Sequence, residues 1–270
     1  MDRIKSVVQI QQLVAEVRAK RRGFLTNFYL DVEKHSVWID KGVLFFLWEG
    51  DTCFLIRKKE KFWNVYFVST GFEDLEKGIR MLEINSEGAP LMVDVVGRKD
   101  QCGALVGLFL KCGYRFSTTF VRMTRIPSVG EKWLASEKVK LVSLEKVKEI
   151  EELLYQFFED KNEQIPYYEE LAFYAKLGHV LACVENDKMM GFLIYEKSPS
   201  TLYLRYWFVH PDFRDKKVGS DLMNRFLEQG KDTKRQLFWV RQDNENALNR
   251  YRHYGFKEDD MFDYIMTNKL

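Results

Sequence analysis

Residues 202–229, LYLRYWFVHPDFRDKKVGSDLMNRFLEQ, decide the fold that we expect for this chain. Aromatic and branched side chains fill 202–209, which suits a buried strand, and Pro211 ends the strand because proline has no N–H for a ladder hydrogen bond. Apolar residues recur at helical spacing from Leu222 to Leu227. The stretch therefore predicts a strand, a turn and a helix.

The turn in front of this helix is basic and ends in a glycine. Arg214, Lys216 and Lys217 precede Gly219. A helix N-terminus presents unpaired N–H groups and the positive end of the helix dipole, and a glycine lets a phosphate approach the main chain closely. The loop therefore suits a pyrophosphate, although a solvated basic turn with a packing glycine would have the same composition.

Two segments resemble the GNAT superfamily of N-acetyltransferases. VHPDFRDKKVGSDLM, residues 209–223, resembles the acetyl-CoA loop of that family, Gln/Arg-x-x-Gly-x-Gly/Ala, except that Lys217 stands at the first glycine. NALNRYRHYGF, residues 246–256, resembles the family's Asn-x-x-Ala-x-x-x-Tyr-x-x-x-Gly-Phe segment. Two signals in the family's order imply the GNAT fold, an α/β fold with a mixed (α+β) sheet.

The expected elements recur in two halves. The first half reads as a helix over 4–21, strands over 43–48, 53–57 and 62–68, a helix over 72–84, a strand over 90–96, a helix over 102–112 and a strand over 118–125. The second reads as a strand from 139, helices over 144–158 and 167–176, strands over 180–185, 189–196 and 202–209, the loop helix, a strand over 236–240, a helix over 245–254 and a strand over 263–267. We therefore expect two tandem units, a degenerate GNAT-like domain over 1–127 and an acetyltransferase domain over 128–270, joined near the IPSVG segment.

Only the second half carries the chemistry. Both halves have a helix that runs into glycine and an aromatic residue, LFLKCGYRF and NRYRHYGFK. Four residues before that glycine stands Phe109 in the first half and Tyr251 in the second, and phenylalanine has no hydroxyl to donate. The first half also has Glu73 and Asp74 where the basic loop would lie. We therefore expect coenzyme A to bind the second unit alone.

The resemblance also implies roles for particular residues. Tyr251 stands at the family's general-acid position, from which a phenol can protonate the departing thiolate. The main-chain amides of Trp207 and Val209 would bind the acetyl and pantetheine carbonyls, and Asn244 or Asn246 would bind the pantetheine arm or cap the helix. The full set implied for acetyl-CoA binding is Trp207, Val209, Arg214, Asp215, Lys216, Lys217, Val218, Gly219, Ser220, Asn244 and Asn246.

Composition limits the partners. Because 42 basic residues nearly balance 40 acidic ones, we expect no nucleic-acid partner. The four cysteines show no ligand-like spacing, so no metal site is expected, and no apolar run has the length of a membrane span. We expect a cytoplasmic protein that does not bind membranes, and a homodimer is left open.

The leading hypothesis is an acetyl-CoA-dependent N-acetyltransferase that acts on a primary amine of a small molecule or peptide, with the first unit supplying a wall of the acceptor cleft. No general base is evident on 203–209, so water-relayed deprotonation, Glu185 and Glu196 are the candidates. One alternative is a non-catalytic acyl-CoA-binding module, which the lysine at 217 and the absent base favour. Another is transfer of a larger acyl or aminoacyl group, for which tandem GNAT-like folds are also used.

Overall fold

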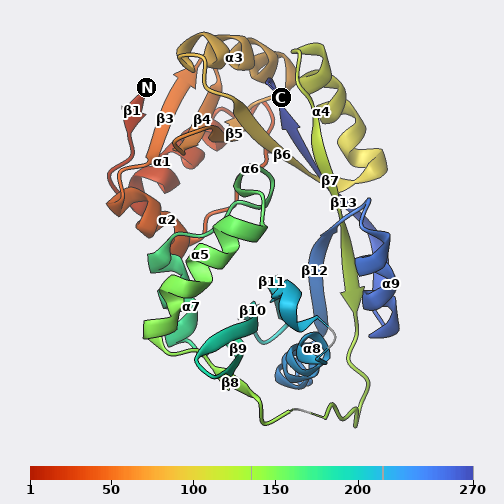
Figure 1. Cartoon of the computed structure of the whole chain (residues 1–270). Helices are drawn as coiled ribbons and strands as arrows, with labels where there is room; N and C mark the ends of the chain where they lie inside the picture. The colour runs from red at the N-terminus through yellow and green to blue at the C-terminus, as the bar shows by residue number, and fades with distance from the viewer. Residues whose placement is uncertain (135, 215, 270) are drawn as a thin grey trace. The chain divides into compact units, whose positions relative to one another are not determined.

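The chain divides into two compact units, which Figure 1 shows as a ribbon. A computed structural model describes residues 1–134, 136–214 and 216–269. Unit 1 comprises Met1–Phe120 and Asp260–Leu270, and unit 2 comprises Val121–Asp259. The expected ranges were 1–127 and 128–270, so the structure differs in placing the C-terminal segment with the first unit.

Unit 1 is built around a mixed sheet. Its strand order is β1-β3-β4-β5-β6-β13-β7, of which β3 to β5 form the predicted antiparallel meander and β6 runs parallel to β5. A short strand, β2, also pairs with β5. The strands are β1 (Asp2–Arg3), β2 (Leu25–Thr26), β3 (Leu44–Glu49), β4 (Thr52–Lys58), β5 (Trp63–Ser69), β6 (Leu91–Arg98), β7 (Arg115–Arg125, shared with unit 2) and β13 (Lys257–Thr267, shared with unit 2). The helices are α1 (Val7–Ala19), α2 (Val32–Asp40), α3 (Phe72–Asn85) and α4 (Lys99–Lys111).

The main core of unit 1 lies between this sheet and helices α3 and α4. Alternate residues of β4, β5 and β6 point toward those helices, as the period-2 pattern of a strand requires. Phe67 of β5 packs against Phe109 of α4, with their ring centroids 6.1 Å apart. The side chains between this sheet and the two helices therefore form one continuous apolar cluster.

Strand β13 lies between β6 and β7 and completes the sheet of unit 1, although its first residues, 257–259, belong to unit 2. It runs antiparallel to β6, with registered pairs from Met261–Arg98 to Thr267–Met92. Asn268 adds a side-chain hydrogen bond, because its Oδ1 accepts the N–H of Leu91 at 2.9 Å. The prediction of a closing strand is confirmed, but its partner is a strand of the first unit.

Unit 2 repeats the same plan. Its sheet has the strand order β7-β12-β11-β10-β9-β8. The elements are β8 (Val139–Leu141), the 3-10 turn η1 (Leu144–Lys146), α5 (Val147–Phe157), α6 (Asp160–Glu163), α7 (Tyr168–Lys176), β9 (Val180–Glu185), β10 (Lys188–Lys197), β11 (Thr201–Val209), the 3-10 turn η2 (Pro211–Phe213), α8 (Val218–Gln229), β12 (Arg235–Arg241) and α9 (Glu245–His253). The predicted elements of both halves are therefore present, whereas α2, α6, β1 and β2 were not predicted.

Helices cover both faces of the unit 2 sheet. Tyr206 and Phe208 of β11 belong to an apolar cluster with α5 and α7, and we call this side the α5–α7 face. Helix α8 packs on the other side, the α8 face, where Phe226 meets Tyr195 of β10 with ring centroids 5.9 Å apart. Within the described ranges, no helix is both long enough and apolar enough to cross a membrane.

The placement of β13 predicts which unit a core mutation there will weaken. Met266 is fully buried in the apolar cluster of unit 1. Met266→Ala should lower the free energy of unfolding by about 2–5 kcal/mol, the usual cost of such a truncation. Amide hydrogen exchange should lose protection in β5 and β6 and keep it in β10 and β11. Met223→Ala in α8 should show the reverse pattern, and protection lost in both units equally would contradict the division.

Candidate active site

The strands β11 and β12 run side by side only at their first residues. Their registered pairs are Thr201–Arg235, Leu202–Gln236 and Tyr203–Leu237, and the pairing ends there. We call the unpaired stretch of β11 that follows, residues 204–209, the β11–β12 opening. Its backbone groups on the β12 side need partners from somewhere else, because unpaired buried N–H groups are costly.

The N–H groups of Trp207 and Val209 point into this opening. The N–H of His210 donates to the carbonyl of Met190 on β10 at 2.9 Å. Successive N–H groups of an extended strand point to opposite sides, so those of Val209 and Trp207 point away from β10. Neither has a partner among the described residues, which is the arrangement that the resemblance requires of them.

A bulge in β11 determines which of its side chains lie on the α5–α7 face and which lie on the α8 face. The register between β10 and β11 shifts after Ile194–Tyr206, where Tyr195 pairs with Leu204, so Arg205 is the extra residue. A bulge re-aims the side chains that follow it and is frequent beside active sites. Tyr206 thereby lies on the α5–α7 face while Trp207 packs at Gly219 of α8.

The N-terminus of α8 is left free of a side-chain cap. Lys217 is the N-cap residue and adopts the left-handed conformation, with φ 61° and ψ 5°, and its side chain makes no capping hydrogen bond. The resemblance places the family's first glycine at this position, and the left-handed backbone of Lys217 is one that glycine adopts readily. Arg214, Lys216 and Lys217 are all exposed, whereas Asp215 lies outside the described residues. Exposed cations around an uncapped helix start are suited to a phosphate group.

The first turn of α8 gives its residues packing roles as well. A Cβ on Gly219 would lie 3.2 Å from Cζ2 of Trp207 and 3.4 Å from Cγ2 of Val209, so a larger residue would press against the strand beneath it. The Ser220 hydroxyl donates to the carbonyl of Lys217 at 2.8 Å, and Val218 is buried. The predicted ligand contacts of these residues are therefore main-chain contacts.

Tyr251 lies over the opening on the α8 face. Its ring centroid is 5.6 Å from that of Trp207 and 4.1 Å from that of Phe238 on β12, so it touches both strands. Burial raises the pKa of Tyr251, which keeps the phenol protonated at neutral pH. Tyr251 is only partly buried, and its hydroxyl has no hydrogen-bond partner among the described residues. The phenol can therefore meet a bound molecule, as the general-acid hypothesis requires.

Trp207 carries a second unpaired donor beside the opening. Its indole Nε1 is buried and has no hydrogen-bond partner among the described residues. An orphaned buried donor is rare in native proteins and calls for a ligand or a water. The position of this donor, between Gly219 and Tyr251, fits an acceptor atom of a bound molecule.

The other predicted residues differ in their exposure and in their hydrogen-bond partners. Asn244 caps α9, because its Oδ1 accepts the N–H of Ala247 at 3.1 Å, and Asn246 is exposed on the first turn of that helix. Glu185 is exposed at the end of β9. Glu196 accepts the Tyr174 hydroxyl at 2.9 Å and lies 3.5 Å from Nε of Arg205, so its carboxylate is already engaged.

Unit 1 has the same strand opening, but its own chain occupies it. The parallel pairs of β5 and β6 end at Val65–Val93, and β2 then pairs with the end of β5. Asn27 bridges the two separating strands: its Nδ2 donates to the carbonyls of Val65 at 3.3 Å and Asp94 at 3.0 Å, and its Oδ1 accepts the N–H of Phe67 at 2.8 Å. The sequence offered no signal for this role, because a single asparagine in a loop has many uses.

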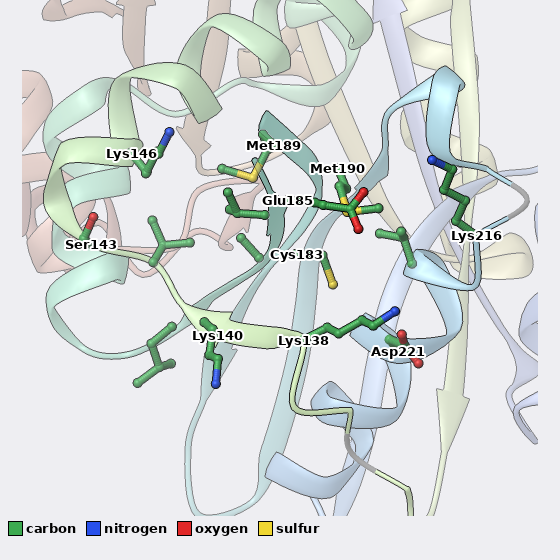
Figure 2. Close-up of a pocket in the computed structure, with 15 residues that line it drawn as sticks. Lys138, Lys140, Ser143, Lys146, Cys183, Glu185, Met189, Met190, Lys216 and Asp221 are labelled. Atoms are coloured by element: carbon green, nitrogen blue, oxygen red, sulfur yellow. The ribbon is translucent and has the colours of Figure 1, made fainter. Parts of the chain in front are cut away.

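A pocket of about 380 Å³ lies beside the start of α8. Figure 2 shows Lys138, Lys146 and Lys216 entering it from three different segments. Lys146 pairs with Glu149 and Asp187, and two carboxylates also line the pocket, those of Glu185 and Asp221. Its described lining includes no residue of β11, β12 or α9, so we treat it as separate from the β11–β12 opening.

The left-handed Lys217 yields a stability prediction. A left-handed backbone costs an ordinary L-residue roughly 1–2 kcal/mol and costs glycine little. Lys217→Gly should therefore raise the free energy of unfolding by about 1 kcal/mol after the extra chain entropy of glycine is counted. Lys217→Ala, which removes the same charge and keeps the strain, is the matched control. Urea unfolding that gives both variants the same stability would show that this backbone is not strained.

Comparison with known proteins places the site in a family. A profile of the acetyltransferase (GNAT) family matches residues 145–256, which include the β11–β12 opening, the α8 loop and Tyr251. An uncharacterized N-acetyltransferase of Methanocaldococcus jannaschii is 28% identical over 88 residues. The aligned segment spans 29% of this chain and 39% of that relative, well under two thirds of its length.

Solved structures extend the similarity to nearly the whole chain. A tandem GNAT protein from the clavulanic acid biosynthesis pathway gives a TM-score of 0.59 at 12% identity, covering 95% of this chain and 93% of that one. A GCN5-related N-acetyltransferase from Sphaerobacter thermophilus gives a TM-score of 0.56 at 14% identity, covering 80% and 76%. At such identities the likeness shows the fold alone. The chain therefore has the mixed α/β fold of tandem GNAT proteins, and its residues 145–256 form a domain of the GNAT acetyltransferase family.

Proposed function

We propose that unit 2 is an acetyl-CoA-dependent N-acetyltransferase that acetylates a primary amine of a small molecule or peptide. The observation that carries the proposal is the β11–β12 opening, which is unpaired in unit 2 and filled by β2 and Asn27 in unit 1. A family that generally uses acetyl-CoA supports the choice of donor. A cytoplasmic location stays a prediction.

The donor would be held along the opening and at the start of α8. The uncapped N–H groups of α8 and the exposed Arg214, Lys216 and Lys217 suit the pyrophosphate. The N–H groups of Trp207 and Val209 suit carbonyl oxygens of the pantetheine arm, which would pair with β11 as a neighbouring strand does. The thioester end would then approach Tyr251, which contacts Trp207 and Phe238.

Unit 1 would bind no acetyl-CoA. Asn27 already hydrogen-bonds the N–H of Phe67, and β2 covers the end of β5. The first turn of α3 carries Glu73 and Asp74, and the Asp74 carboxylate accepts the Thr70 hydroxyl at 2.6 Å. Carboxylates at the helix start would repel a pyrophosphate.

This difference between the units predicts the binding stoichiometry. Calorimetric titration with acetyl-CoA should give one site per chain. Arg214→Glu should weaken binding at least about tenfold, because it places a carboxylate beside the pyrophosphate, and a charge-assisted contact contributes about 1.5–3 kcal/mol. Lys234→Glu, an exposed charge reversal beyond the end of α8, should leave the affinity unchanged. Two equivalent sites per chain, or equal affinities of the two variants, would contradict the proposal.

The role of Tyr251 predicts a loss of rate without a loss of fold. Tyr251→Phe removes one hydroxyl and almost no volume, so acetyl-CoA affinity and melting temperature should change little. If the phenol protonates the thiolate, kcat should fall by about two orders of magnitude, a usual contribution of a general acid. Tyr254→Phe is the control, because Tyr254 packs on Trp133 and should keep its full rate. Wild-type kcat in folded Tyr251→Phe would assign proton donation to water or another group.

A further inference from the structure

We propose that the carboxylate of Glu163 is the general base, which accepts the proton that the acceptor amine loses on the α5–α7 face of the β11–β12 opening. The inference rests on the proposed acetyltransferase function. It goes beyond the sequence, in which Glu185 and Glu196 were the carboxylate candidates. Glu163 ends the four-residue helix α6, a segment that the sequence did not predict.

Glu163 is anchored to β11 beside the opening. Its main-chain carbonyl accepts the hydroxyl of Tyr206 at 2.7 Å. Tyr206 immediately precedes Trp207, whose N–H points into the opening, so Glu163 is held at the level of the predicted ligand contact. Gln164 follows in the left-handed conformation, which turns the chain sharply after Glu163. The backbone of Glu163 is therefore tied to the strand, and the N–H of Glu159 holds its carboxylate.

The two proposed proton-transfer groups lie on opposite faces of one strand. Tyr251 contacts Trp207 on the α8 face, whereas Glu163 is bonded to Tyr206 on the α5–α7 face. An acid on the donor side and a base on the acceptor side of the same opening is what acyl transfer to an amine requires. In that step the C–N bond forms and the C–S bond breaks. The amine proton passes to Glu163, and the Tyr251 phenol proton passes to the thiolate. Both groups then exchange protons with water.

The charges around Glu163 suit a base at neutral pH. Burial raises its pKa to about 7, and the nearby carboxylate of Glu159 also raises it. The N–H of Glu159 donates to the Glu163 carboxylate at 3.0 Å, and the guanidinium of Arg241 at the end of β12 also attracts a negative charge. Arg241 is itself paired with Asp243, with Nη2 and Oδ2 2.9 Å apart. A base whose pKa lies near the working pH is half ionised there and still accepts a proton readily.

The competing carboxylates are less suited to this role. Glu196 already accepts the hydroxyl of Tyr174 and faces Arg205, so its lone pairs are engaged. Glu185 lines the separate pocket beside α8 with Lys216 and Asp221. Glu196 meets the stretch of β11 that follows Tyr203 through its ion pair with Arg205, which occupies the carboxylate.

The test compares Glu163→Gln with wild type in the full chain, with an amine that wild type acetylates. Wild-type kcat should rise with pH through a midpoint near 7, because a protonated Glu163 cannot act as a base. In Glu163→Gln, kcat should no longer rise with pH through this midpoint. It should also fall by about 10²-fold or more, the usual contribution of general-base catalysis. Its calorimetric affinity for acetyl-CoA should remain that of wild type.

Glu159→Gln is the matched control and keeps the test decisive if Glu163→Gln does not fold. It removes the negative charge beside Glu163, so kcat should still rise with pH, but the midpoint of the rise should shift to lower pH. A ¹³C titration of the Glu163 carboxyl should show the same shift without any substrate. Wild-type rate and pH profile in folded Glu163→Gln, or an unmoved midpoint in Glu159→Gln, would overturn the inference. Absence of acetyl-CoA binding to wild type would instead overturn the proposed function itself.

Discussion

The separation of two parallel strands after three paired residues is the constraint on which the rest of the molecule depends. Each backbone N–H that leaves a ladder must find another partner, because an unpaired buried donor costs free energy. Unit 1 meets this requirement with its own chain, since β2 pairs with β5 and Asn27 bridges β5 and β6. Unit 2 leaves the N–H groups of Trp207 and Val209 for another partner. The same fold can therefore be a closed support in one half and a binding site in the other.

At the start of α8, a lysine stands at a glycine position of the family pattern and still has a left-handed backbone. Lys217 replaces the glycine of the family pattern but holds φ 61°, the left-handed conformation for which glycine is preferred. Sparsely populated backbone conformations persist where the surrounding structure over-determines them, and they cluster at functional sites. Here the following residue, Val218, is buried, and Gly219 is fitted tightly against Trp207. The lysine therefore adds a cation at the helix start while its backbone holds a conformation that suits glycine.

The internal similarity of the two units is visible in how their last helices end. Gly113 and Gly255 both have positive φ, 88° and 84°, and the N–H of the next aromatic residue returns to the carbonyl of Phe109 or Tyr251. Both of those rings touch the strand that borders the opening, Phe67 in unit 1 and Trp207 in unit 2. Phe109 is buried among aromatic rings and has no polar atom to place at the opening. One hydroxyl thus separates a packing residue from a candidate acid.

Local patterns in the sequence determined most of the elements, and the resemblance to a family predicted the residues of the candidate donor site. The alternation of 202–209, the helical spacing after Gly219 and the glycine-aromatic ends are short-range signals, and side chains with periods of 2 and 3.6 report them directly. Helix α2 was not predicted because three of its apolar residues, 37–39, are consecutive and do not recur at helical spacing, and it buries only His35 and Trp38. Tertiary structure alone decided three features. It gave β13 to the sheet of unit 1, it placed Asn27 between β5 and β6, and it fixed Glu163 to Tyr206. Each depends on a hydrogen bond or strand pairing between segments distant in the chain, and no local periodicity records which distant partner will satisfy a backbone or carboxyl group.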